Sequence, residues 1–134
     1  MRSFMELVVD LREVLTALNG AAAESGFDLA LSDGDLHAAT IALQQAQSAL
    51  AVANARVLRH WDTRHVWAPG GHRSAASRLA LDARLSKRSA QRELHRARLL
   101  ALMPLTADAV AAGSLSIDHA DLFARANQPH RRAR

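Results

Sequence analysis

The chain has 134 residues, and 49% of them are apolar, mostly Ala and Leu, while Cys and Tyr are absent. This length suffices for one domain with a hydrophobic core. The missing Cys excludes disulfides and zinc–thiolate sites, and it allows a cytosolic setting. Because Ala, Leu, Arg and Gln favour helix over strand, we expect an all-α fold, a helical bundle. From the absence of Cys we also expect a cytoplasmic protein.

The net charge of +4 is unevenly distributed along the chain. Residues 1–55 carry two basic and seven acidic side chains, whereas residues 56–98 carry eleven basic and three acidic ones. A positive middle section favours a polyanionic partner. No uncharged apolar run is long enough to span a membrane, and charges interrupt the first fifteen residues, so we expect neither a signal peptide nor a membrane partner.

The first predicted helix runs from Phe4 to Leu18, because apolar residues recur on one of its faces and Asn19-Gly20 is a typical stop signal. A long helix is predicted from about Gly34 to Trp61, with a cap supplied by the preceding polar residues.

Along this long helix a large apolar residue recurs every seven positions, with Ala three residues after each of the first three. This heptad stripe consists of Leu36, Leu43, Leu50 and Val57. Two interpretations stay open. The favoured one packs the stripe against the first helix, which would bury Leu43 and Leu50; the other is a homodimeric coiled coil.

Four shorter helices are predicted after the turn at residues 68–72. They run from about Ala75 to Arg84, from Lys87 to Met103, from Thr106 to the break at Gly113, and from the cap at Ser116 to Ala126. We expect one helical domain over residues 1–126, followed by a polar, basic, frayed tail over residues 127–134.

The stretch "ARLSKRSAQREL", residues 83–94, has the spacing of a helix-turn-helix. Ala80 is the small residue of the first helix, Leu85 the apolar turn residue, Ser86 the cap and Ala90 the packing residue of the second helix. The departure is Arg84, where Gly is usual. A left-handed conformation is costly for other residues, so a longer turn or one of another shape is expected.

The helix after Ser86 has two different sides in projection. Ala90, Leu94, Ala97 and Ala101 share one side, and a last turn with Leu99, Leu100 and Leu102 should be buried nearly all round. The other side is basic, and it predicts DNA contacts through Lys87, Arg88, Gln91, Arg92 and Arg96. The alternative is a solvated outer face of an ordinary bundle.

The turn "GGHRS", residues 70–74, is a weaker candidate for binding phosphate. Its two Gly residues let the backbone approach a ligand closely, and Arg73 is therefore included among the candidate DNA contacts. A plain linker with a helix cap is the favoured interpretation of this turn.

The histidines do not predict a metal site. His60, His65 and His72 are near one another in sequence, but Asp62 is the only acid among them, and metal sites need convergent ligands. His119 with its acidic neighbours Asp118 and Asp121 is better interpreted as a capped helix start. We expect no metal, no cofactor and no catalytic residue, hence no enzyme.

Residues 70–126 resemble the N-terminal domain of the actinobacterial 13E12-repeat family, called domain of unknown function 222. The resemblance is specific over residues 61–126 and looser before them. Its motifs are the G-x-R-S opening at Gly71–Ser74, the Ala-rich helix at Ala75–Leu81, the Leu85-Ser86 turn, the Arg-rich helix at Arg88–Leu100, the step at Met103-Pro104, and Ala111–Ala120.

In longer members of that family this domain precedes an HNH nuclease module, which we expect to be absent from this chain. The resemblance therefore implies a non-catalytic leading part of an HNH-endonuclease-like protein, and no catalytic residue carries over. DNA contact is the expected function. The rivals are a protein-interaction or dimerisation module that uses the heptad stripe, and a non-functional truncated relic.

Overall fold

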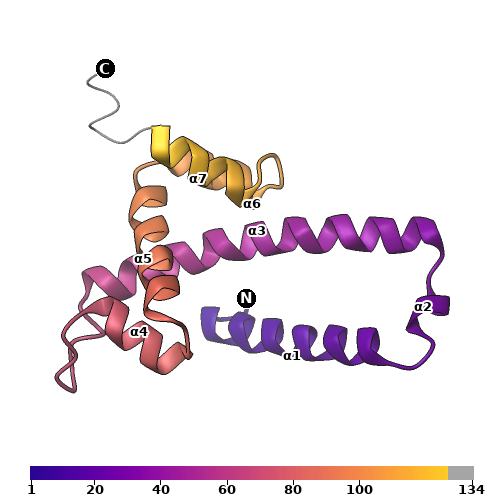
Figure 1. Cartoon of the computed structure of the whole chain (residues 1–134), viewed down its shortest axis with the longest axis horizontal. Helices are drawn as coiled ribbons and strands as arrows, with labels where there is room; N and C mark the ends of the chain where they lie inside the picture. The colour runs from indigo at the N-terminus through magenta and orange to yellow at the C-terminus, as the bar shows by residue number, and fades with distance from the viewer. Residues whose placement is uncertain (127–134) are drawn as a thin grey trace. The chain divides into compact units, whose positions relative to one another are not determined.

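A computed structural model of the chain describes residues 1–126, which are helical and contain no strand, so the predicted all-α class is confirmed (Figure 1). The helices in this range are α1 (Phe4–Ala23), α2 (Phe27–Ala30), α3 (Asp33–Thr63), α4 (Ala75–Ala83), α5 (Lys87–Ala101), α6 (Pro104–Ala111) and α7 (Ile117–Ala126). The tail predicted for residues 127–134 lies outside the described residues. No helix among residues 1–126 combines the length and the apolar character needed to cross a membrane.

The chain divides into two compact units, residues 1–41 and residues 42 onward, with the boundary inside α3. The sequence pattern, in contrast, predicts one domain over residues 1–126. The first unit contains no buried residue. Its helix α1 begins with a reciprocal capping box between Ser3 and Glu6.

Two features of the first unit differ from the prediction. Helix α1 continues through Asn19-Gly20 to Ala23, because the Asn19 side chain donates to the Leu15 carbonyl within the helix and Gly20 keeps a helical backbone. The positive φ of 86° appears instead at Gly26, and the one-turn helix α2 that follows it was not predicted.

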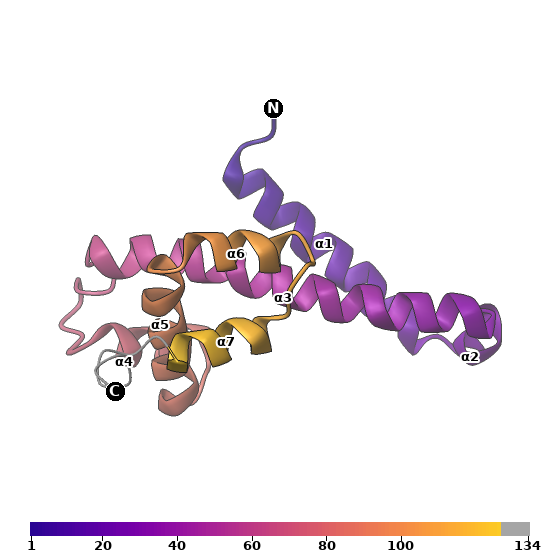
Figure 2. The same cartoon turned by 90° about the horizontal axis from the view of Figure 1, so that it is seen from above.

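The core of the second unit is built around α5, which crosses the C-terminal part of α3 steeply in Figure 1; Figure 2 shows the same helices from above. Helix α4 packs on α5, and α6 and α7 pack on α5 and on each other. Buried core residues are Val52, Ala55, Leu58, Ala75, Leu94, Ala97, Leu100, Ala107, Val110 and Ala120. Small side chains in this set let the helices approach closely.

Most helix starts of the second unit follow from the predicted caps. The hydroxyls of Ser74 and Ser86 accept from the backbone N–H groups of Ser77 and Ser89, at 3.1 and 3.0 Å. One start was wrong: α6 begins at Pro104, two residues before Thr106, since the fixed φ of Pro suits the first position of a helix.

The heptad stripe is exposed, so the prediction that Leu43 and Leu50 are buried is wrong. Its members Leu36, Leu43, Leu50 and Val57 are 45%, 46%, 42% and 45% exposed. The buried face of α3 is instead formed by Ser48, Val52, Ala55 and Leu58. This face follows the helical spacing of three and four residues, and it lies at other positions than the stripe.

Candidate nucleic-acid interface

The turn between α4 and α5 is tight, because α4 ends at Ala83 and α5 begins at Lys87. Arg84 itself adopts the left-handed conformation, with φ 56° and ψ 43°, so the expectation of a longer or differently shaped turn is wrong. The N–H of Leu85 donates to the Ala80 carbonyl over 3.0 Å and closes the end of α4. Left-handed backbone costs about 1–2 kcal/mol for a residue with a Cβ, and the packing of α4 on α5 offsets this cost.

The N-terminal part of α5 has one buried and one exposed side, as predicted. Ala90 and Leu94 are buried, at 0% and 3% exposure. The exposed side chains on the other side are those of Lys87, Arg88, Gln91 and Arg92. The three cations among them form no ion pair within residues 1–126, so their charge is available to an external anion.

The C-terminal end of α5 is less buried than predicted. Leu100 is buried at 5% exposure, but α5 ends at Ala101, and Leu102 beyond it is 72% exposed. The change of direction into α6 turns Leu102 away from the core, whereas the sequence pattern had placed it inside a continuing helix.

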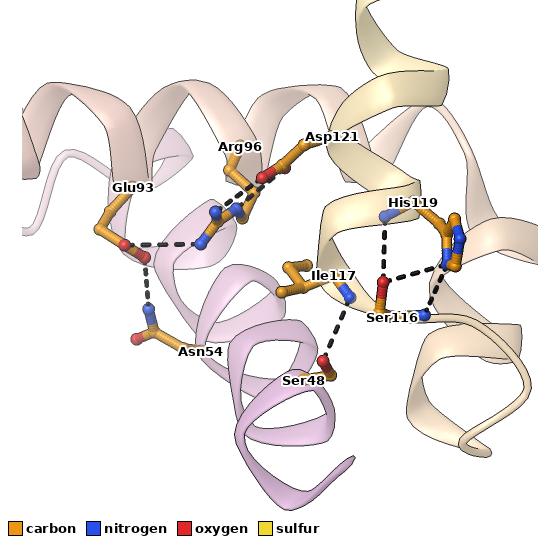
Figure 3. Close-up of polar contacts among 8 residues, drawn as sticks. All are labelled: Ser48, Asn54, Glu93, Arg96, Ser116, Ile117, His119 and Asp121. Atoms are coloured by element: carbon orange, nitrogen blue, oxygen red, sulfur yellow. Dashed lines mark hydrogen bonds and ion pairs between the residues drawn. The ribbon is translucent and has the colours of Figure 1, made fainter. Parts of the chain in front are cut away.

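Arg96 does not belong to the exposed basic side of α5, which corrects its predicted place on that side. Its Nε donates to Asp121 Oδ1 over 3.1 Å and its Nη2 donates to Asp121 Oδ2 over 2.8 Å, so that the pair is bidentate (Figure 3). A carboxylate oxygen of Glu93 lies 3.6 Å from Nη1. The Arg96 side chain is only 18% exposed, and it is used to join α5 to α7.

The electrostatics of Arg96 agree with this role. The hydrogen bond from its guanidinium to Asp121 raises the pKa of Arg96 above its ordinary value, against burial, which lowers it. An arginine with a raised pKa stays charged at every physiological pH. The Arg96 side of the pair therefore keeps its charge.

Two further polar contacts fix α5 on α3. Asn54 of α3 donates to Glu93 over 3.2 Å, and Arg98 donates to Asp62, a carboxylate that is 15% exposed, over 3.0 Å. Together with the link to α7, these contacts hold α5 from two neighbouring helices. A helix held in this way presents its exposed side chains in a fixed geometry.

The turn at residues 70–74 is a structured linker. Gly70 and Gly71 have φ values of 92° and 80°, and Arg78 donates to the Pro69 carbonyl over 2.8 Å. The Ser74 hydroxyl is occupied as the cap of α4. Arg73 is exposed, and its contact with DNA stays a prediction.

The candidate metal ligands are not brought together. Within residues 1–126 no group of three His, Asp or Glu side chains could hold a metal ion. The Asp62 carboxylate is paired with Arg98, and the His65 ring nitrogen lies 3.2 Å from the Thr63 carbonyl.

His119 takes part in a capped helix start. Its backbone N–H donates to the Ser116 hydroxyl over 3.2 Å, while its Nδ1 accepts from the Ser116 N–H, also over 3.2 Å. Histidine here replaces the usual Glu or Gln of a capping box. The buried Ser48 hydroxyl accepts from the Ile117 N–H over 3.1 Å and ties this helix start to α3 (Figure 3).

The network around Arg96 was not predicted from the sequence. One signal was present, because Glu93 precedes Arg96 by three residues, a spacing at which opposite charges pair on a helix. Nothing local in the sequence pointed to Asn54 or Asp121 as partners, since both are distant from α5 along the chain.

Comparison with protein families, curated proteins and solved structures finds no match to this chain.

Proposed function

We propose that the second unit contacts DNA through the N-terminal half of α5. The observation that carries the proposal is the two-sided character of this helix. Ala90 and Leu94 on its apolar side are buried in the core. The exposed residues on its other side are Lys87, Arg88, Gln91 and Arg92. A capped helix that follows a tight turn and exposes basic residues at its start is the arrangement by which helix-turn-helix proteins enter the major groove.

The types of side chain also suit this partner. Arginine forms bidentate hydrogen bonds with phosphate and with guanine, and glutamine does so with adenine. The contacts of α5 with α3 and α7 support the proposal as well, because a preorganised helix loses less entropy when it binds.

The resemblance to domain of unknown function 222 also supports the proposal. On that basis the chain acts as the non-catalytic, DNA-contacting part of an HNH-endonuclease-like protein, in the cytoplasm. The relic interpretation predicts a chain that folds but has no DNA affinity.

A second candidate function is homodimerisation through the heptad stripe on α3. The observation that favours it is the exposure of all four members, between 42% and 46%, in a pattern that coiled coils use. Sedimentation at increasing concentration, with the Leu43→Ala and Leu50→Ala variants, tests this function. A monomer at every concentration would contradict it.

The DNA proposal is tested by titrating a short duplex with the full chain at several salt concentrations. Contacts to phosphates release counterions, so the affinity should fall steeply with salt, with a logarithmic slope of about −0.9 for each phosphate contact. Absence of binding at low salt, or binding that does not depend on salt, would contradict the proposal.

A further inference from the structure

A groove of about 400 Å³ lies between α5 and α7. Arg92 and His95 line it from α5, Arg125 lines it from α7, and Leu99 and Ala120 contribute to its apolar surface. The volume is within the range of sites that bind small ligands or parts of larger ones. Because the lining comes from two helices that pack together, the groove is a feature of the folded unit.

The charges that line this groove are unequal. They comprise the guanidinium groups of Arg92, Arg96 and Arg125 and the single carboxylate of Asp121. Arg96 and Asp121 neutralise each other in their bidentate pair. Arg92 and Arg125 form no ion pair within residues 1–126, which leaves two uncompensated positive charges beside an apolar surface.

The groove is continuous with the proposed DNA-contacting side of α5. Arg88, Arg92 and His95 are spaced by four and three residues, which places them on the same face of the helix. Arg88 and Arg92 are exposed on that side, and Arg92 and His95 also line the groove. A nucleic-acid backbone that contacts Arg88 and Arg92 along this face would therefore place its next phosphate at the groove.

We propose that the groove between α5 and α7 binds a phosphate group of a nucleic-acid backbone, held by Arg92 from one helix and Arg125 from the other. This inference rests on the proposed function and extends the contact surface to α7. Guanidinium groups match the geometry of phosphate oxygens. A free phosphate compound offers the same chemistry, and the two arms of the experiment distinguish the two sources.

In the first arm, the full chain and its Arg125→Ala variant are titrated with duplex DNA at several salt concentrations. Arg64→Ala, which removes one exposed charge elsewhere, is the matched control. Loss of one phosphate contact should lower the affinity about 3–10-fold and the salt slope by about 1 relative to the control. If the two variants behave alike while the wild type binds, the inference is overturned and the proposed function stands.

In the second arm, inorganic pyrophosphate is added to the full chain and the arginine Nε–H signals are followed by NMR. Saturable shifts at Arg92 and Arg125 that are lost in Arg125→Ala would support the phosphate site. If the wild type also fails to bind duplex DNA, a free phosphate compound is the source and the proposed function has failed. Shifts that are absent, or equal at all exposed arginines, would overturn the site.

Discussion

Arg96 of α5 and Asp121 of α7 form a bidentate ion pair, with N–O distances of 3.1 and 2.8 Å. Because its guanidinium is bound to Asp121, Arg96 holds α5 against α7 and does not add to the exposed positive charge of α5. Arg88 and Arg92 on the same helix remain exposed. The arginines of α5 therefore separate into two structural ones, Arg96 and Arg98, and two that are available to a partner.

The ion pair should contribute to stability. Arg96→Ala and Asp121→Ala should each lower the free energy of unfolding by about 1–3 kcal/mol, since each leaves a partly buried charge without its partner. The double variant should lose less than the sum of the two. Arg88→Ala, an exposed control on the same helix, should change stability by less than about 0.5 kcal/mol. Additive losses in the denaturation cycle would mean that the two side chains do not interact.

Two leucines of α3 should differ sharply in their contribution to the core. Leu58→Ala should cost about 2–5 kcal/mol, because Leu58 is 6% exposed and a cavity remains after truncation. Leu50→Ala should cost less than about 1 kcal/mol, because Leu50 is 42% exposed. Chemical denaturation at two protein concentrations measures both. A large loss at Leu50 that grows with concentration would place the stripe between two copies of the chain.

The left-handed residue of the turn offers a stabilising substitution. Arg84→Gly should raise stability by up to about 1 kcal/mol, since Gly adopts a φ of 56° without the strain caused by a Cβ. Arg84→Ala, which removes the same side chain but keeps the Cβ, is the control and should not stabilise. Destabilisation by Gly, measured as a lower thermal midpoint, would show that the turn depends on the arginine side chain.

The chain by itself should not cleave DNA. Incubation of supercoiled plasmid with magnesium or manganese should leave it intact, since the sequence contains no recognisable catalytic arrangement. Nicking that requires the metal and disappears in His60→Ala or His65→Ala would contradict this expectation.

The sequence predicts the local features of this fold well. The caps at Ser74 and Ser86, the two-sided pattern of α5 around Ala90 and Leu94, and the length of α3 all depend on residues close together in the chain. Capping and periodicity act over a few residues, so the order of the amino acids alone reveals them.

Features that depend on distant residues could not be predicted in the same way. The face of α3 that is buried depends on which helices pack on it, and Ser48 and Ala55 gave no signal comparable to the regular Leu43 and Leu50. Arg96 has the same spacing as its exposed neighbours, and only the fold brings Asp121 to it. The same limit applies to Arg125, which joins Arg92 in one groove through the packing of α7.

The central claim is that the exposed arginines of α5 contact DNA, and a matched pair of double variants tests it most directly. Arg88→Ala/Arg92→Ala and Arg12→Ala/Arg64→Ala each remove two exposed positive charges, so the change in net charge is the same. Duplex binding is titrated at several salt concentrations, with helicity checked by circular dichroism. The α5 variant should remain folded, bind roughly tenfold more weakly, and lose about 2 from its salt slope, while the control should retain nearly the wild-type slope. Equal affinities and slopes for the two folded variants would contradict the claim and make this side of α5 the solvated outer face of a helical bundle.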